Sequence, residues 1–496
     1  MMAAARTNFV CTDESNRFAT AINMLPDDIL LDIFDFCRKN YRDNPRNARI
    51  CPVWEWHVLV HVCRRWRQIV FESPIRLNIQ ILCTYGTPVR TNLDIWPAFP
   101  IAVHLDGMRY FRYHNEDEAF AALEHYDRVS IIRLCLSSTH LEWMAAVMRE
   151  PYPALTSLNI DSWGDDALAF PADFLGGSTP CLQEIILSNF PFPALPTLLL
   201  STSDLVTLVL HKIPPAGYFS PEALGASFAI LPNLKTLSIQ FRSDTSRPGR
   251  LRPPLTTRTV LPFLTSFDFH GAFGYLEALV AQIESPQLNR MSIEYFNRRV
   301  DFQVAQLSTY IHCSLRPEQR PFKRANVCFH GEALSFILYS QENLPDGDQR
   351  AVEITVACKA FGWQFSPLLQ VIDQFHATIY TGTITHLELN INLEGDRQIR
   401  GVRDVEWLDF LHEFPAMRVL HVASRVLARH IALALEEITV EMAVEVLPFL
   451  ELVYLEGRPA SSIEKFVTAR RSTNYPITVV DTTEEFNKRL ESYARK

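Results

Sequence analysis

One short pattern recurs along most of this chain and constrains its fold more than any other feature. The pattern is apolar-x-x-apolar-x-apolar, as in "ALTSLNI" and "NLKTLSI". Its clear copies start at Leu155, Leu182, Leu205, Leu234, Leu264, Leu288, Ile384, Met417 and Leu450, and weaker copies start at Val129 and Ala351. The seven starts from Val129 to Leu288 lie 23 to 30 residues apart, and the four starts from Ala351 to Leu450 lie 33 apart. Such spacing predicts an array of similar structural units.

The frame itself indicates a strand, because residues two apart on a strand share a face. Segments of helical character, such as "SPEALGASFAI" and "DVEWLDFLHEF", separate the copies. Isolated copies occur by chance, and the polar Asn or Cys of strict repeats is absent. The long succession, commonly preceded by a proline, nevertheless favours a solenoid over an ordinary α/β domain. We therefore expect an α/β fold: an irregular leucine-rich-repeat solenoid with parallel strands on the concave face and helices outside.

The gap between the copies at Leu288 and Ala351 leaves room for one more strand near Phe322, although "FKRANVCF" matches the frame poorly. Residues between the two inward apolar positions of each strand point outward, and they form a polar, slightly acidic row. A solvated face and a partner-binding face are equally compatible with it. The residues we predict to face a target protein are Asn159, Asp161, His211, Gln240, Asp268, His270, Glu294, Glu388 and His421.

Composition excludes several classes of partner. The net charge of -9 over 496 residues provides no basic field for nucleic acid or for an anionic membrane. No secretory signal and no run long enough to span a bilayer is present. The ten cysteines contain no C-x-x-C pair, which is typical of reduced, buried thiols. We expect a folded protein of the cytoplasm or the nucleus, without nucleic-acid or membrane partners.

Two helices are predicted near the start of the chain. "LPDDILLDIF" places Pro26 at a first helical position and two aspartates in the first turn, both favourable helix-start features. "WEWHVLVHVCRRWRQIVFESP" predicts one further helix that ends before Pro74. Its apolar stripe comprises Leu59, Val62, Cys63, Trp66, Ile69 and Val70. These helices occupy about sixty residues, near the lower limit of an independent domain.

The combination of "LPDDI" with a downstream "VCRRWR" resembles the F-box motif. The chain is similar to F-box proteins of mushroom-forming fungi, in which an N-terminal F-box precedes a leucine-rich-repeat-like body. The resemblance covers the first hundred residues well and the remainder only as a loose repeat. Two features depart from the family pattern: residues 38–55 lengthen the connection between the helices, and Ile75-Arg76-Leu77 replaces the closing Leu-Trp.

The resemblance implies that the helices dock a Skp-type adaptor, which connects the chain to a cullin-RING ubiquitin ligase. The residues that match adaptor-facing positions are Leu25, Pro26, Ile29, Ile33, Leu59, Val62, Cys63 and Trp66. Some of these side chains must close the core of the helical module instead, and the sequence does not sort them. The lengthened connection could either lie clear of the adaptor or block it.

Motifs for catalysis are absent. The chain contains no G-x-S-x-G, G-x-x-x-x-G-K-[ST] or G-x-G-x-x-G segment. His57 and His61 have the spacing of two metal ligands on a helix, but they lack the Glu of H-E-x-x-H and a third ligand. The acidic stretch "DSWGDD" at 161–166 is explained by a polar loop. We expect no catalytic residue, no metal site and no cofactor.

The predicted organisation has five parts. They are a flexible tail (1–20), the F-box-like helical module (21–78), a connecting segment that caps the solenoid (79–127), the solenoid (128–457) and a C-terminal capping unit (458–496). The expected function is target recognition for a Skp-cullin-F-box ligase, in which adaptor and target bind at opposite parts of the chain. The alternative is an interaction scaffold that engages no ligase.

Overall fold

The computed structural model divides into two compact units, residues 1–134 and residues 135–496, which we describe separately. The predicted tail at 1–20 lies outside the described residues. The structure describes residues 22, 24–42, 55–74, 76–84, 89–106, 116–163, 169–243, 258–295, 305–316, 321–330, 333–340, 351–357, 369, 372–373, 381–392, 404–438, 447–456 and 460–481.

In its described residues the first unit combines five α-helices with the beginning of a parallel sheet. Its elements are α2 (Asp27–Arg42), α3 (Glu55–Val60), α4 (Arg64–Glu72), β1 (Ile81–Cys83), α5 (Val89–Ile95), β2 (Ile101–Asp106), α6 (Glu116–Leu123) and β3 (Val129–Ser137), whose last residues belong to the second unit. Strands β1 and β2 pair in parallel, with Ile81 opposite Ile101. The predicted connecting segment therefore contains strands of its own.

The prediction of one helix over "WEWHVLVHVCRRWRQIVFESP" is wrong. The segment forms α3 and α4, and Cys63 between them is the N-cap of α4, where its Sγ accepts a hydrogen bond from the N–H of Trp66 at 3.4 Å. Because the helix restarts at this cap, residues before and after it do not share one stripe. Val62 is accordingly 55% exposed, whereas Ile69 and Val70 are buried.

Trp56 anchors α3 to the residues around β2. Its ring packs edge-on against Trp96 at 5.0 Å and Phe99 at 5.6 Å between ring centroids. Its indole N–H donates to the carbonyl oxygen of Gln80 at 3.2 Å, so the ring is buried with its polar atom satisfied. A small helical module gains a larger apolar core by this packing.

The lowered pKa of His104 on β2 predicts that the first unit is sensitive to acid. Burial, followed by the charge of Arg133, lowers the pKa of His104 from 6.5 to about 4, and its Nε2 atom has no hydrogen-bond partner among the described residues. A histidine with a depressed pKa stabilises the fold above its unfolded pKa, and this stability is lost as pH falls toward the folded pKa. We expect a loss of about 3 kcal/mol from this group between pH 7 and pH 4.

The acid sensitivity can be measured by pulse proteolysis in urea, with fragments of the first unit as the readout. Wild type should lose stability between pH 6.5 and about 4, and His104→Asn should remove most of that loss because Asn does not titrate there. An unchanged pH profile in the variant would show that other groups cause the acid sensitivity.

The second unit alternates strands and helices along most of its length. Its strands are β4 (Ser157–Trp163), β5 (Glu184–Ser188), β6 (Thr207–Ile213), β7 (Thr236–Phe241), β8 (Thr259–Val260), β9 (Ser266–Gly271), β10 (Ile283–Glu284), β11 (Arg290–Tyr295), β12 (Arg324–His330), β13 (Ala333–Tyr339), β14 (Ala351–Ala357), β15 (His386–Asn392), β16 (Val419–Ala423), β17 (Leu452–Leu455) and β18 (Thr478–Asp481). Its α-helices are α7 (Ser138–Val147), α8 (Leu195–Leu199), α9 (Pro221–Phe228), α10 (Phe273–Val280), α11 (Ala305–Leu315), α13 (Asp404–His412), α14 (Arg425–Glu436) and α16 (Ala460–Ser472).

The sheet is mostly parallel and contains sixteen strands. In the second unit the order is β4-β5-β6-β7-β9-β11-β14-β13-β12-β15-β16-β17-β18, and β8 and β10 form a separate pair. In every clear copy of the sequence pattern the second and third apolar residues lie on a strand, and the first apolar residue precedes that strand by two positions. The outward residues of these strands are in register, so that Ser157, Glu184, Thr207, Thr236, Ser266 and Arg290 are successive neighbours.

The expectation that successive strands all stack in parallel is wrong in the middle of the sheet. Strands β12 and β13 form an antiparallel pair, and β13 is also antiparallel to β14. Only two residues separate His330 from Ala333, and a parallel connection needs a dozen or more. The short link requires a hairpin, which places β14 rather than β12 beside β11.

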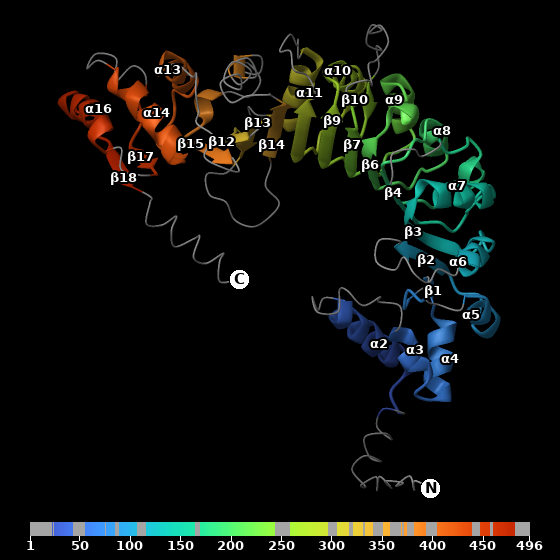
Figure 1. Ribbon diagram of the computed structural model, residues 1–496. Helices are drawn as coiled ribbons and strands as arrows, with labels where there is room; N and C mark the ends of the chain where they lie inside the picture. Colours follow the sequence, from blue (N-terminus) through green and yellow to red (C-terminus); the bar gives the residue numbers. More distant parts are fainter. Residues whose placement is uncertain are drawn as a thin grey trace, which may run out of the picture. The chain divides into compact units, whose positions relative to one another are not determined.

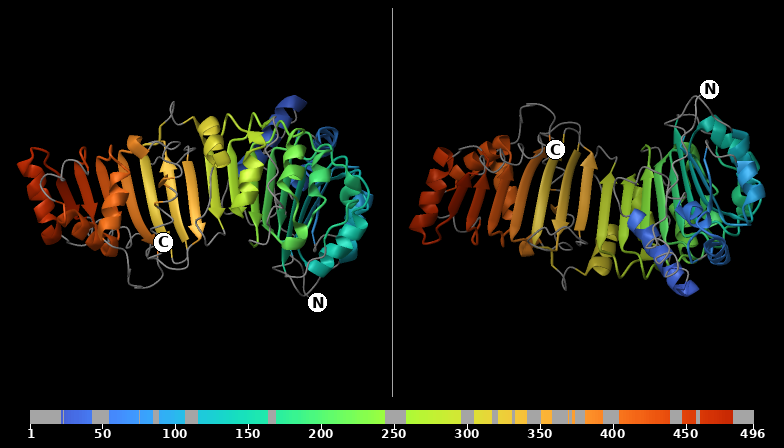
Figure 2. Two further views of the ribbon diagram at one scale, coloured as in Figure 1. Left: turned by 90° about the horizontal axis from the view of Figure 1, so that it is seen from above. Right: turned by 90° about the horizontal axis from the view of Figure 1, so that it is seen from below.

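Helices and apolar strand residues form the core on one side of this sheet. Figure 1 shows α9, α10 and α11 on the same side of the strands, and the right view of Figure 2 shows the yellow and orange strands largely uncovered. Inward residues such as Leu237, Phe269 and Val422 are completely buried. None of the described helices combines the length and apolar character required to cross a bilayer.

Candidate interaction surfaces

Helix α2 carries apolar residues on two different faces. Leu30, Leu31 and Phe34 are buried, and the Phe34 ring lies 4.7 Å from that of Trp66 on α4. Ile29 and Ile33 are 45% and 40% exposed, although the same sequence pattern contains them. Helix α2 thus has a second, exposed apolar stripe, a feature that is frequent at protein–protein contact sites.

The structure sorts the predicted adaptor-facing residues. Ile29, Ile33, Val62 and Pro26 are exposed, whereas Leu25, Leu59, Cys63 and Trp66 are half-buried, and none belongs to the buried core. The core is formed by their neighbours Leu30, Leu31, Phe34, Trp56, Val60, Ile69 and Val70. All eight predicted residues therefore retain accessible side-chain surface.

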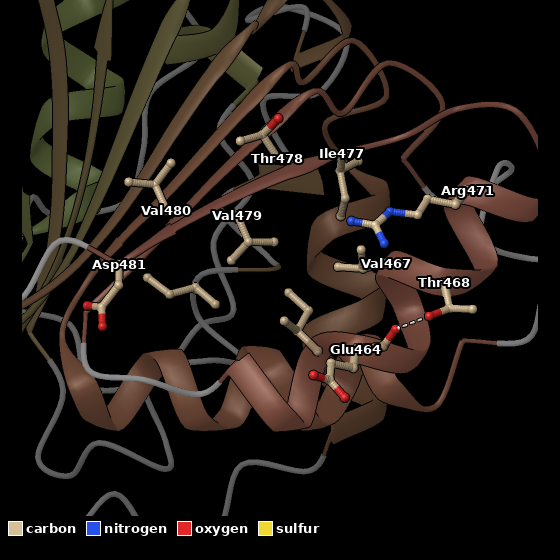
Figure 3. Close-up of a pocket in the computed structure, with 11 residues that line it drawn as sticks. Glu464, Val467, Thr468, Arg471, Ile477, Thr478, Val479, Val480 and Asp481 are labelled. Atoms are coloured by element: carbon tan, nitrogen blue, oxygen red, sulfur yellow. Dashed lines mark hydrogen bonds between the residues drawn. The ribbon is translucent and has the colours of Figure 1, made fainter.

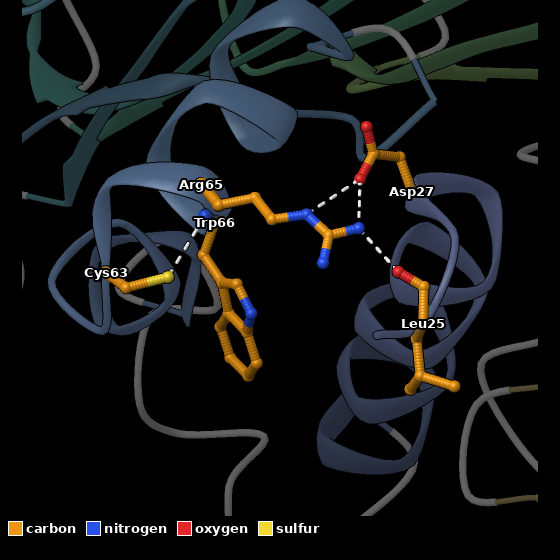
Figure 4. Close-up of polar contacts among 5 residues, drawn as sticks. All are labelled: Leu25, Asp27, Cys63, Arg65 and Trp66. Carbon is orange, nitrogen blue, oxygen red and sulfur yellow. Dashed lines mark hydrogen bonds and ion pairs between the residues drawn. The ribbon is translucent and has the colours of Figure 1, made fainter. Parts of the chain in front are cut away.

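Arg65 brings the start of α2 to α4 (Figure 4). Its guanidinium donates to the Asp27 carboxylate, at 3.0 Å from Nε and 2.5 Å from an Nη atom, and also to the carbonyl oxygen of Leu25 at 2.5 Å. Both charged side chains are at least a third exposed, so the ion pair contributes little stability. Its effect is geometric: Leu25 and Trp66, forty-one positions apart in the sequence, are held in one small module.

Four further exposed apolar residues among the described residues of the module were not predicted. They are Ile22, Met24, Phe36 and Val58, which are 43%, 81%, 65% and 68% exposed. Phe36 follows Ile29 and Ile33 at helical spacing, and this spacing could have identified it. With the exposed Ile29, Ile33 and Val62, these residues form what we call the apolar surface of the helical module.

The lengthened connection between the predicted helices is shorter than the sequence suggested. Residues 38–42 continue α2, and Glu55 begins α3. Residues 43–54 lie outside the described residues, as do the side chains of 37–42 and of His57. The question of whether this segment obstructs an adaptor therefore concerns these twelve residues alone.

Every predicted target-facing residue lies on the outward face of the sheet in the second unit. All nine are half-buried and alternate with buried neighbours along their strands. Opposite the helices, the described strands carry the carboxylates of Asp161, Glu184, Asp268, Glu294, Glu353 and Glu388. Arg290 and Arg324 contribute positive charge to the same face, where carboxylates outnumber them.

Cross-strand hydrogen bonds order this outward face. Asp268 accepts from the Ser238 hydroxyl at 2.7 Å and from the Gln240 amide at 2.8 Å. His270 and Glu294 lie 3.6 Å apart on neighbouring strands. Such contacts fix side chains that would otherwise lose rotamer freedom when a partner binds.

A shallow hollow of about 160 Å³ opens on the same face over β12, β15, β16 and β17. Arg324 and Glu388 form an ion pair at one side, and both side chains are less than a fifth exposed. His421 and Tyr454 stack edge-to-face at 5.6 Å at the other side. The hollow has the size of one apolar side chain, and aromatic and arginine groups of this kind are frequent at the centres of interfaces.

The described residues hold no cluster of His, Cys, Asp or Glu side chains that could bind a metal ion. No family model matches the chain, and no curated protein is significantly similar to it. Assignment of a function therefore depends on the residues and surfaces described above.

Proposed function

We propose that the chain is the target-recognition subunit of a Skp-cullin-F-box type ubiquitin ligase. In this proposal the apolar surface of the helical module docks the adaptor, and the outward face of the sheet in the second unit holds the target protein. The chain contributes no catalytic group. It raises the local concentration of target lysines near a transfer centre that another subunit supplies.

One observation carries the proposal. The residues that match adaptor-facing positions of the F-box motif keep accessible surface, while the apolar residues between them are buried. An isolated small helical module would be expected to bury its apolar residues first, because that burial is its main source of stability. Exposed Ile29, Ile33 and Val62 are better explained by a partner that covers them.

Co-purification tests the adaptor half of the proposal. The full-length chain should recover a Skp-type adaptor as a stoichiometric complex when the two are expressed together. Failure of wild type to recover the adaptor would overturn the ligase assignment and leave the interaction scaffold as the remaining function.

We further propose that the second unit is an irregular leucine-rich-repeat solenoid. The in-register rows and the buried inward residues support this assignment, because each strand-helix unit needs its neighbours to bury its apolar face. The antiparallel β12–β13 pair is then an insertion within the repeat array.

The excess of carboxylates on the outward face favours a target with a basic segment. Replacing Asp268 and Glu294 by Lys should reduce recovery of wild-type targets by about tenfold or more, since like charges would face the partner. Adaptor recovery should not change. Quantitative mass spectrometry of complexes captured with the proteasome inhibited measures both, and equal target recovery would exclude this face.

A further inference from the structure

A groove of about 570 Å³ lies between α16 and β18 (Figure 3). Its apolar lining includes Ile463, Val467, Ile477 and Val479. Charged and polar groups stand at its rim, where Figure 3 labels Glu464, Thr468, Arg471 and Asp481. We call it the β18 groove.

The β18 groove is the open end of the core. Strand β18 is the last in the sheet order and pairs in parallel with β17 alone. Val479 lies opposite Val453 in that register, yet Val453 is completely buried and Val479 only partly. Asp481 lies opposite buried Leu455 and is exposed. The inward side chains of β16 and β17 are thus apolar and buried, whereas those at the matching positions of β18 are partly or fully exposed.

Helix α16 is fixed to the sheet beside this groove. Arg470 on α16 is 1% exposed, and its guanidinium donates to the carbonyl oxygen of Leu450 at 2.9 Å. Ile463 on the same helix is also buried. The groove therefore has a formed wall, at which Val467 and Val479 are only partly buried and leave apolar surface for an occupant.

The segment that follows β18 has the composition of such an occupant. Residues 482–496, "TTEEFNKRLESYARK", lie outside the described residues and begin directly after Asp481 at the rim. Phe486, Leu490 and Tyr493 recur at helical spacing, which predicts one apolar stripe. Thr482 and Glu485 have the spacing of a capping box.

Charges of the segment complement those of the groove. On the predicted helix Glu485 and Arg489 flank the apolar stripe, where Glu485 is available for Arg471 and Arg489 for the carboxylates of Glu464 and Asp481. Because the segment is tethered at the groove, its docking is intramolecular and needs little intrinsic affinity.

We propose that residues 482–496 dock in the β18 groove as an amphipathic helix, with Phe486 and Leu490 against Val467 and Val479. The docked segment completes the core and covers the open end of the sheet. This inference is independent of the ligase assignment.

Photo-crosslinking in the full-length chain tests the position of the segment. Leu490→benzoylphenylalanine should cross-link to peptides from 460–481 of the same chain. Ser492→benzoylphenylalanine, on the side of the predicted helix opposite Leu490, is the matched control and should give few such products. A mixture of isotopically light and heavy chains distinguishes two occupants: light–heavy products would show that a second copy fills the groove and would overturn the proposal.

Hydrogen exchange supplies a second measurement. Phe486→Asp combined with Leu490→Asp should raise exchange of amides in 463–481 by about tenfold or more, because a charge opposes docking on an apolar wall. Ser492→Asp, on the side of the predicted helix opposite Leu490, should leave the exchange at wild-type rates. Equal rates in wild type and the double variant, with size-exclusion profiles unchanged, would also overturn the proposal.

Discussion

Replacing Ile33 by Asp should weaken adaptor binding by about a hundredfold or more without unfolding the chain. Ile33 is 40% exposed on α2 and contributes little to the module core. A carboxylate placed in an apolar interface loses its hydration without gaining a partner, and a cost of about 3 kcal/mol corresponds to this factor. Titration of the purified chain with a Skp-type adaptor, by calorimetry or interferometry, measures the change.

Two further variants make this result specific. Leu433→Asp places the same charge at a position of equal exposure, 40%, on α14 of the second unit, and should leave adaptor affinity unchanged. Phe34→Ala removes a buried ring and should lower both stability and adaptor binding. If Ile33→Asp binds the adaptor as tightly as wild type, α2 does not form the docking surface.

Much of the second unit could be predicted because one periodicity controls both its strands and its core. Leu158 and Ile160, the two inward residues of "LTSLNI", are completely buried, and Asn159 between them is partly exposed. Alternation of this kind is a local property that follows from strand geometry. The same alternation constrains the pairing register of neighbouring strands, since a slip by one residue would turn the apolar side chains outward.

The hairpin in the middle of the sheet could not be found with that pattern. "RANVCFH" and "ALSFILY" alternate well, and Ala333, Phe336 and Leu338 fit the repeat frame, but the frame indicates a strand and not its direction. Their two-residue separation was the available signal, since it excludes a parallel crossover. A search for repeats alone passes over such an insertion.

The residues proposed to face the adaptor could not be sorted into core and surface from the sequence. Ile29 and Leu30 are adjacent, similarly apolar and on the same helix, and the contact between Phe34 and Trp66 decides which side of α2 faces α4. That contact joins residues far apart in the sequence, so helical spacing alone does not reveal it. The break at Cys63 could not be predicted either. The Cys63 side chain caps α4, so the apolar pattern that appeared continuous belongs to two helices.

Buried aromatic side chains lie beneath the proposed target-binding face. Phe269 is completely buried on β9 and stacks on Tyr275 of α10, with ring centroids 5.9 Å apart. Phe241 on the neighbouring strand lies 4.8 Å from the same tyrosine ring. Space is limited here: a Cβ at Gly271 would approach the Phe241 and Phe269 rings to 2.8 and 2.9 Å. Asp268 and His270, which flank Phe269, point to the opposite face.

Phe269→Ala should therefore lower the free energy of unfolding of the second unit by about 3–5 kcal/mol, since it removes a buried ring and leaves a cavity. Phe263→Ala is the matched control, because Phe263 is 46% exposed in the same repeat, and it should change stability by about 0.5 kcal/mol or less. Pulse proteolysis in urea, scored on fragments of 135–496, measures both. Equal changes in the free energy of unfolding for the two variants would show that β9 and α10 do not enclose a tightly packed core beneath the outward face.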